Sequence, residues 1–298
     1  MPSEAPESGT DRLAVVFDME TSDPDDFLAL LLLAGHPAVD LRAVTLVPGT
    51  PHQVGLVAWA LAKFGLDIPV GGFDPARAVR AVSGWHYRAY GSIPPVSGAV
   101  DAPQLLSDIC DEATTLISGA PLKNVGAAIR SDSSLTLGRL VVQGGFAGTG
   151  VVAEPDQLPK FRGRRTFPSY NLDGDRTSVT AVLAHNRIGT RRFVSKNVAH
   201  GVVYDAVMHA RLADAARDHL SIQLIRQGME VYLERRPEGK KLHDPLACCC
   251  AIDESVAGWT EVELYRDEEG WGARPRTGSR TFITTSYDPE RFLAVLTS

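Results

Sequence analysis

The stretch LAVVFDMETSDPDDFLALLLL, residues 13–33, joins two apolar runs through a short and strongly acidic segment. Five acidic residues fall within nine positions there, namely Asp18, Glu20, Asp23, Asp25 and Asp26. Carboxylates this close repel one another, and burying them without a partner is costly. A hard metal ion that takes oxygen ligands would remove this cost. The alternative is that Asp25 and Asp26 only cap the following helix, although a cap needs one or two carboxylates and not five.

The remaining apolar segments predict an α/β fold, because strand-like runs alternate with helical patterns along the chain. Strands are expected at 13–17, 39–46, 139–143 and 192–196, and helices at 26–34, 53–64, 105–116, 122–129, 178–185, 205–219 and 220–234. Such alternation is typical of a mostly parallel open sheet with helices on both faces. Residues 260–296 predict an antiparallel hairpin at one edge of this sheet, followed by a short helix.

Length and composition bound the class of protein. The chain has 298 residues, of which 44% are hydrophobic and 22% charged, as in ordinary globular proteins. No linker or repeat interrupts residues 12–298, so we expect a single domain there, preceded by a polar, disordered leader over 1–11. A net charge of −6 argues against nucleic-acid binding, and no apolar run is long enough to span a bilayer.

The cysteines and the leader indicate a compartment. Cys110 and the run Cys248–Cys250 show no CxxC spacing, so we expect reduced thiols. Residues 1–11 lack the basic start and apolar stretch of a signal peptide. Both features favour a cytoplasmic protein.

A second motif, Lys241-Leu-His243-Asp244-Pro245, opens another apolar run far along the chain. By itself it could be a plain helix start, with Asp as the cap and Pro in the first turn. Two long segments, 72–100 and 148–171, are predicted to be loops, and long loops in α/β domains often bind ligands.

Together the two acidic motifs resemble the nucleoside hydrolases of the inosine–uridine-preferring type. That family opens with an apolar strand and an Asp-x-Asp-Pro-Gly-x-Asp-Asp signature, where this chain has DMETSDPDD at 18–26. Further pieces follow in the family's order over nearly the whole chain after residue 12. They are AVTLVPGT at 43–50, PLKNV at 121–125, VQGGF at 142–146, Tyr170-Asn171 with Asp175, and His243-Asp244-Pro245.

The resemblance implies a nucleoside-hydrolase-like fold and hydrolysis of the N-glycosidic bond of a ribonucleoside, with Ca²⁺ in the pocket. The metal ligands it implies are Glu20, Asp26, Asp244 and the backbone carbonyl of Lys123, with Asp18 or Asp23 as alternatives to Glu20. Asp25 would bind the ribose hydroxyls, and Glu20 or Asp25 would take a proton from the attacking water. His243 would protonate the departing base, because a histidine titrates near neutral pH.

Other positions are expected to contact the substrate. They are Thr50, where the family usually has an Asn on the ribose, Gln143, Ser169, where a Glu beside the sugar is usual, Asn171 on the 5′ side, and His86, His200 and Tyr232, each of which could equally be a packing residue. The loop before Ser169 carries Lys160, Arg162, Arg164 and Arg165. These four side chains either form an ordinary solvated surface, or they indicate that the substrate carries a 5′-phosphate or another anionic group.

Two other functions are compatible with these residues. One is a different metal-dependent hydrolase, such as a phosphatase, which would release phosphate and not base. The other is a non-catalytic nucleoside-binding protein on the same fold, because a fold does not fix a function. The resemblance also implies a homodimer or homotetramer.

Overall fold

The computed structural model describes residues 12–77, 79 and 81–298, and the expected leader therefore lies outside the described residues. The strands of the described part are β1 (Leu13–Met19), β2 (Val39–Leu46), β3 (Val70–Gly72), β4 (Val100–Asp101), β5 (Thr115–Ser118), β6 (Leu137–Gln143), β7 (Thr166–Phe167), β8 (Ile188–Val194), β9 (Val203–Tyr204), β10 (Lys240–Lys241), β11 (Ala257–Arg266), β12 (Trp271–Pro275) and β13 (Thr281–Tyr287).

Helices connect most of these strands. They are α1 (Pro24–Gly35), α2 (Pro51–Lys63), α3 (Gly84–Tyr90), α4 (Ala102–Ile109), α5 (Lys123–Ser131), α6 (Tyr170–Asp173), α7 (Arg176–Ala184), α8 (Lys196–Ala199), α9 (Ala206–Arg211), α10 (Ala215–Asp218), α11 (Leu220–Leu233), α12 (His243–Ile252) and α13 (Pro289–Leu296), with short 3₁₀ turns at Glu154–Asp156, Pro159–Phe161 and Glu254–Val256. No helix in the described ranges is long and apolar enough to cross a membrane.

The main sheet has 11 strands in the order β4-β3-β2-β1-β5-β6-β8-β13-β11-β12-β7. Pairing is parallel from β4 through β13 and antiparallel from β13 to β7. The predicted α/β class and the antiparallel edge at the C-terminal end are therefore confirmed. A separate antiparallel pair, β9 with β10, lies outside this sheet.

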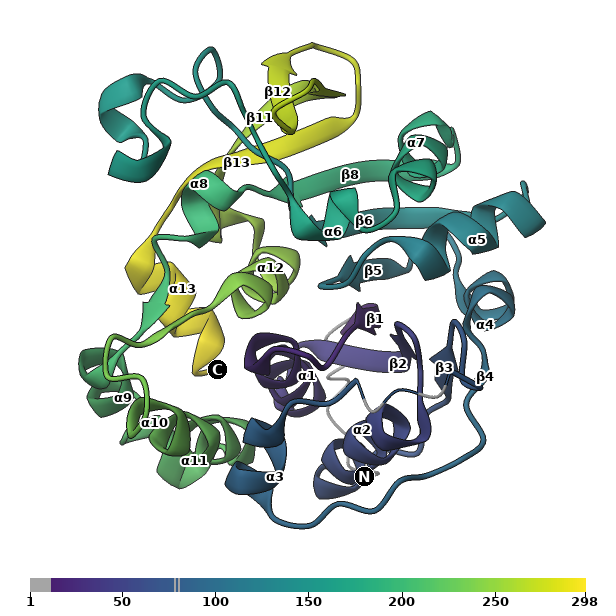
Figure 1. Ribbon diagram of the computed structural model, residues 1–298, viewed down its shortest axis with the longest axis vertical. Helices are drawn as coiled ribbons and strands as arrows, with labels where there is room; N and C mark the ends of the chain where they lie inside the picture. The colour runs from purple at the N-terminus through teal and green to yellow at the C-terminus, as the bar shows by residue number, and fades with distance from the viewer. Residues whose placement is uncertain (1–11, 78, 80) are drawn as a thin grey trace, which may run out of the picture.

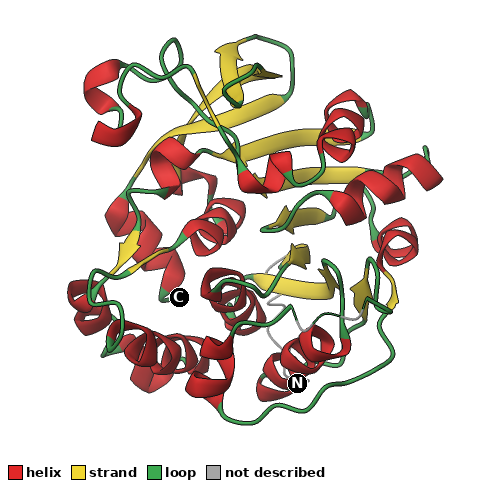
Figure 2. Ribbon diagram, in the orientation of Figure 1, coloured by secondary structure: helices red, strands yellow, loops and turns green. Residues whose placement is uncertain are grey.

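Helices cover both faces of the sheet (Figures 1 and 2). Successive residues of β1 point to opposite faces, so Val15 and Phe17 join one apolar core and Val16 joins the other. The first core contains α1, α11, α12 and α13, and the second contains α4, α5 and α7. Burial on both faces explains why β1 is an unbroken apolar run up to its acidic end.

Several predicted elements differ in extent. The helix expected over 105–116 is α4, which ends at Ile109 because Asp111 accepts hydrogen bonds from Ala113 N and Thr114 Oγ1 and makes a tight turn before β5. The helix expected over 205–219 is divided into α9 and α10. The antiparallel hairpin was predicted with two strands, but the structure has a third strand, β12. It pairs with the edge of β11 that faces away from β13.

The two predicted loops contain ordered elements. The first carries α3, whose Trp85 and Tyr90 side chains donate hydrogen bonds to backbone carbonyls of α11 and lie in the first core. The second carries two 3₁₀ turns, β7 and the start of α6. In both segments buried aromatic residues dock the chain onto the body of the protein.

Candidate active site

Two helix starts bring the acidic motifs together beyond the carboxyl end of β1. Asp25 and Asp26 lie in the first turn of α1, Asp244 lies in the first turn of α12, and these two helices pack side by side (Figure 1). One carboxylate oxygen from each of the three residues lies within 4.8 Å of the other two. All three residues are buried, at 2%, 2% and 4% exposure. Helix N-termini favour negative charge, but they do not neutralise three buried carboxylates.

The space between these carboxylates fits a hard cation. The Oδ1 atom of Asp244 is buried and has no hydrogen-bond partner among the described residues. Gly119, in the turn after β5, leaves this space open, because a Cβ there would lie 2.6 Å from Asp26 Oδ1 and 2.8 Å from Asp244 Oδ1. The donors are all oxygens, which suits Ca²⁺ or Mg²⁺ and does not suit a thiolate-binding metal.

The electrostatics of the three carboxylates also favour a bound cation. Burial raises the pKa of Asp26 well above its usual range, and repulsion from Asp244 and Glu20 raises it further. Burial and repulsion from Asp25 do the same to the pKa of Asp244. A bound cation would offset this effect, because it favours the ionised form of both carboxylates.

The two other carboxylates of β1 and its loop have different surroundings. Glu20 borders the cluster, because its backbone N–H donates to Asp26 Oδ1 at 3.2 Å, but its carboxylate accepts hydrogen bonds from Ser22. Asp18 lies behind the cluster. Its oxygens accept hydrogen bonds from Thr45 Oγ1, Ser118 Oγ and Asn124 Nδ2 at 2.7, 3.0 and 2.7 Å.

The expectation that Asp18 is a direct ligand is therefore not matched by its position. Three side-chain donors occupy its carboxylate, and burial raises its pKa to about 6. It ties β1 to β2, to β5 and to the start of α5, where Lys123 precedes Asn124. Asp18 thus supports the turns that carry Gly119 and Lys123.

A buried lysine that the sequence analysis missed contacts the cluster. The ammonium of Lys240 lies 3.1 Å from Asp25 Oδ1 and 3.1 Å from Asp23 Oδ2. Its side chain is 7% exposed and that of Asp25 is 3% exposed. Burial would raise the pKa of Asp25, but Lys240 and His243 outweigh that effect and lower it, so Asp25 is ionised without a metal. Asp23 is about half exposed and is held by Lys240, outside the three-carboxylate group.

We expect Lys240→Met to destabilise the fold by about 3–5 kcal/mol, because removing one partner of a buried pair leaves the other charge uncompensated. Urea unfolding of the chelator-treated protein measures this loss. Lys241→Met is the matched control, since Lys241 is the next residue, is exposed and forms no ion pair among the described residues. Equal stability of the two variants would contradict the assignment.

His243 lies on the other side of Asp25. Its Nδ1 is 3.5 Å from Asp25 Oδ2, and its ring stacks on His200 with centroids 4.9 Å apart. Burial lowers the pKa of His243 to about 4, and the attraction of Asp25 only partly offsets this effect. The expectation of a histidine that titrates near neutral pH is thus wrong for the metal-free protein. Its imidazole is neutral at pH 7.

A sequence model described as inosine-uridine preferring nucleoside hydrolase matches residues 15–294 of this chain. The chain belongs to this family. Nucleoside hydrolases are N-glycosyl hydrolases that generally bind a metal ion, and the acidic cluster agrees with that property. The family match and the fold together support hydrolysis of ribonucleosides at the N-glycosidic bond.

Other comparisons agree with membership of the nucleoside hydrolase family. An uncharacterized protein of Aquifex aeolicus is 26% identical over 260 residues, which is 85% of this chain and 86% of that protein. An inosine-guanosine nucleoside hydrolase structure superposes with a TM-score of 0.71 at 18% identity, covering 95% of this chain and 97% of the other. A purine-preferring ribonucleoside hydrolase from Gardnerella vaginalis gives 0.67 at 15% identity, covering 95% and 96%. At 15% and 18% identity, these two superpositions show that the fold is shared.

Polar residues expected at the sugar form a buried network in this nucleoside hydrolase. Asn171 Nδ2 donates to Gly119 O at 2.8 Å and to Gln143 O and Oε1 at 2.9 and 3.0 Å. Ser169 Oγ accepts a hydrogen bond from Gly145 N at 3.1 Å. Asn171 thus links the turn after β5 to the end of β6 beside the carboxylates.

Two further positions flank this region. Thr50 is the N-cap of α2, is 1% exposed, and donates its backbone N–H to Gln53 Oε1 at 3.0 Å. Tyr170, which the sequence analysis did not select, is 67% exposed, and the negative charges of Glu20 and Asp26 help to raise the pKa of its phenol. Its exposed ring therefore lies within electrostatic range of the acidic cluster.

Of the ring residues expected at the base, His86 is buried in the protein and Tyr232 lines a cavity beside the acidic loop. His86 is fully buried, and its ring packs against Trp85 and Phe27 at 4.9 and 5.3 Å. It is therefore a core residue of α3 in this structure, because that helix buries its aromatic face. Tyr232 lines a cavity of about 280 Å³ next to the acidic loop, together with Ser22, Pro24, Ser83, Trp85, Arg88, Val231, Arg235 and Arg236.

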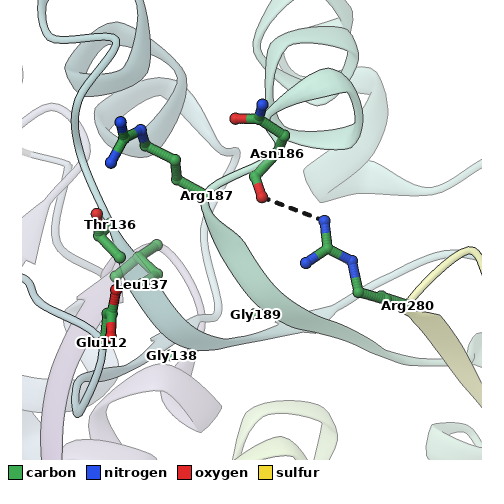
Figure 3. Close-up of a pocket in the computed structure, with 8 residues that line it drawn as sticks. All are labelled: Glu112, Thr136, Leu137, Gly138, Asn186, Arg187, Gly189 and Arg280. Atoms are coloured by element: carbon green, nitrogen blue, oxygen red, sulfur yellow. Dashed lines mark hydrogen bonds between the residues drawn. The ribbon is translucent and has the colours of Figure 1, made fainter.

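A larger cavity, of about 470 Å³, lies at the opposite ends of the strands (Figure 3). Arg187, Arg280 and Glu112 line it, and Arg280 donates a hydrogen bond to the Asn186 carbonyl at 3.1 Å. Ligands of open α/β sheets bind at the carboxyl ends of the strands. The cavity also lacks the aspartates of the family signature, so the carboxylate cluster is the candidate active site.

Proposed function

We propose that this protein hydrolyses the N-glycosidic bond of a ribonucleoside, with Ca²⁺ held by Asp26, Asp244, Glu20 and the carbonyl of Lys123. The observation that carries the proposal is the buried group of Asp25, Asp26 and Asp244, in which Asp244 Oδ1 has no hydrogen-bond partner among the described residues. Glu20 has to turn from Ser22 to join the ligands, a change that costs two hydrogen bonds to an exposed residue.

The chain's own residues supply most of the chemistry. Cleavage passes through an oxocarbenium-like state, and the buried negative charge of Asp25 stabilises the positive charge that develops on the sugar. Lys240 keeps Asp25 ionised, and Lys240 and His243 together contact its two oxygens and would orient it toward the ribose hydroxyls. When bound, Ca²⁺ would hold the ribose diol and the attacking water and lower the pKa of that water.

Proton transfer is assigned to two groups at opposite ends of the site. Asp25 or Glu20 would take the proton of the attacking water. His243 would hydrogen-bond the departing base, and it would take up a proton from solvent before passing that proton to the base. Tyr232, His200 and the arginine-lined cavity beside the acidic loop would contact the base, and Asn171, Gln143, Ser169 and Thr50 would lie on the sugar side.

The direct test follows free base by chromatography. The protein, first treated with a chelator and then dialysed, is incubated with a panel of purine and pyrimidine nucleosides and their 5′-monophosphates, with and without Ca²⁺. We expect release of base from at least one member, dependent on the added metal. Release of phosphate alone would favour a phosphatase, and binding without any release would favour a non-catalytic nucleoside-binding protein.

We further propose a cytoplasmic homodimer or homotetramer. The thiols support the first part, because Cys110 and Cys248–Cys250 form no disulfide and burial raises the pKa of all four. Multi-angle light scattering of the purified protein tests the second part.

A further inference from the structure

We propose that Lys160, Lys196 and Lys241 form an anion subsite beside the candidate active site, and that it takes a phosphate monoester on the sugar of the substrate. The inference rests on the proposed function and names its substrate class. The sequence suggested an anion site formed by the loop cations Lys160, Arg162, Arg164 and Arg165. The structure retains only Lys160 from that loop and adds Lys196 and Lys241.

A chain of direct contacts joins Lys160 to the site. Its ammonium hydrogen-bonds His200 Nδ1, His200 stacks on His243, and His243 Nδ1 is 3.5 Å from Asp25 Oδ2. Lys160 therefore lies two aromatic rings away from the carboxylate expected to bind the ribose. Phe161, the next residue, packs its ring on His200 at 5.3 Å and holds the lysine in place.

The other two lysines reach the same place from separate elements. Lys196 begins α8, and its ammonium lies 5.3 Å from the ring centroid of Phe167 in β7. Lys241 is in β10, two residues before His243, and pairs with Val203. Lys160 lies 4.9 Å from the ring of Phe161, and that ring packs on Phe167 at 4.9 Å, so Lys160 and Lys196 flank one pair of aromatic rings. Burial and repulsion from Lys241 and Lys196 lower the pKa of Lys160.

These cations have no carboxylate partner within 4.0 Å in the described part of the chain, whereas the neighbouring Lys240 has two. The acid that acts on Lys196 is Asp173, and it already pairs with Arg176 and Arg266. Convergent like charges repel one another, so holding them together without counter-ions costs free energy. A bound dianion would repay that cost, and lysine is a common phosphate ligand.

The scaffold fixes the lysines relative to one another. Asn197 in α8 accepts a hydrogen bond from Leu158 N and donates one to Ala147 O, both at 3.0 Å, which pins the loop of Lys160 to the helix of Lys196. Phe161 packs on Phe146 and Phe167 at 5.2 and 4.9 Å. The subsite is therefore held by buried groups even though the lysine ends reach solvent.

The remaining loop cations lie elsewhere. Arg164 stacks over Phe167 at 5.6 Å, and Arg165 lines a separate cavity with Tyr265. Arg162 is exposed and has no side-chain contact in the described structure. Since Phe167 leads directly into Ser169 and Asn171, the residues expected on the 5′ side of the sugar, we place the phosphate at the 5′ position.

The first test compares kcat/KM for uridine and inosine with kcat/KM for their 5′- and 3′-monophosphates. We expect the 5′-monophosphates to be cleaved at least about 10-fold better than the nucleosides, with a gain that falls as salt is added. Lys160→Ala with Lys241→Ala should reduce the ratio of 5′-monophosphate to nucleoside to near one. Arg162→Ala, a matched charge removal in the same loop, should leave the ratio unchanged.

The outcomes separate this inference from the proposed function. Cleavage of nucleosides without a gain for the 5′-monophosphates would overturn the subsite and leave the hydrolase proposal intact. An equal gain for 3′-monophosphates would also overturn it, because it would show unspecific attraction. If no base is released at all, calorimetry of the Ca²⁺-supplemented protein decides: binding of ribose 5-phosphate at least 10-fold tighter than ribose supports the subsite, and equal binding refutes it.

Discussion

Asp26→Asn and Asp244→Asn should each lower kcat/KM for a ribonucleoside by about 10³-fold or more, the range expected when a charge that stabilises a transition state is removed. Both residues belong to the buried group whose oxygens lie within 4.8 Å of one another. Asparagine keeps the size of the side chain and removes the charge, so the loss would come from electrostatics and metal binding. Steady-state base release measures the loss of kcat/KM, and Ca²⁺ titration by calorimetry measures the loss of metal affinity.

The same two variants should become more stable in the absence of metal. Burial and repulsion raise the folded-state pKa of Asp26 and Asp244 above the unfolded value, so ionisation at neutral pH favours the unfolded chain. A neutral amide removes that penalty. Urea unfolding in chelator should therefore show a higher midpoint for both variants than for the unmodified protein, and this gain should shrink as the pH is lowered, because the aspartates then become neutral as well.

The matched control is Asp23→Asn. Asp23 lies in the same acidic loop, but its side chain is 52% exposed and it contacts Lys240, outside the three-carboxylate group. We expect it to lower kcat/KM far less than either buried variant. Full activity of Asp26→Asn, or the same loss in Asp23→Asn, would show that the cluster is not the reaction centre. Lower stability of both buried variants in chelator would contradict the electrostatic account.

The sequence predicted the acidic strand end and the distant His243-Asp244 pair because both rest on local rules. An apolar run that stops at clustered carboxylates, and a second acid at a helix start, can be recognised without knowing which segments meet. Their meeting follows from the packing of α1 on α12, which the family resemblance implied and which no local pattern shows.

The missed features depend on contacts between distant segments. Lys240 lies 215 residues from Asp25 in the sequence, so no local pattern indicates their pairing, yet its ammonium contacts Asp23 and Asp25. For His86 the structure favours the packing role, which was one of its two expected roles. A histidine among aromatic residues in a predicted loop suggested a pocket wall, but the segment folds into α3 and buries that face. Only the tertiary structure distinguishes these cases.

His243→Ala should lower kcat for a nucleoside by about 10²–10⁴-fold, the usual contribution of a positioned acid–base group. It should have little effect on a p-nitrophenyl riboside, whose leaving group departs without a proton. The contrast follows from the position of the ring, which contacts Asp25 through Nδ1 and has a buried Nε2 with no partner among the described residues. A nitrogen without a partner in the described structure, next to the carboxylate proposed to bind the sugar, is available to the departing base.

The nitrophenyl substrate also tests a second role, because His243 lies 3.5 Å from Asp25 Oδ2 and can orient that carboxylate. If the histidine acted only by orienting Asp25, its removal would slow both substrates equally, since both develop the same charge on the sugar. A loss confined to the nucleoside assigns it to the leaving group. Since burial lowers its pKa to about 4, the ring is neutral before the substrate binds. The ring would therefore have to take up a proton from solvent before it can protonate the departing base, and this demand is greatest for the poorest leaving group.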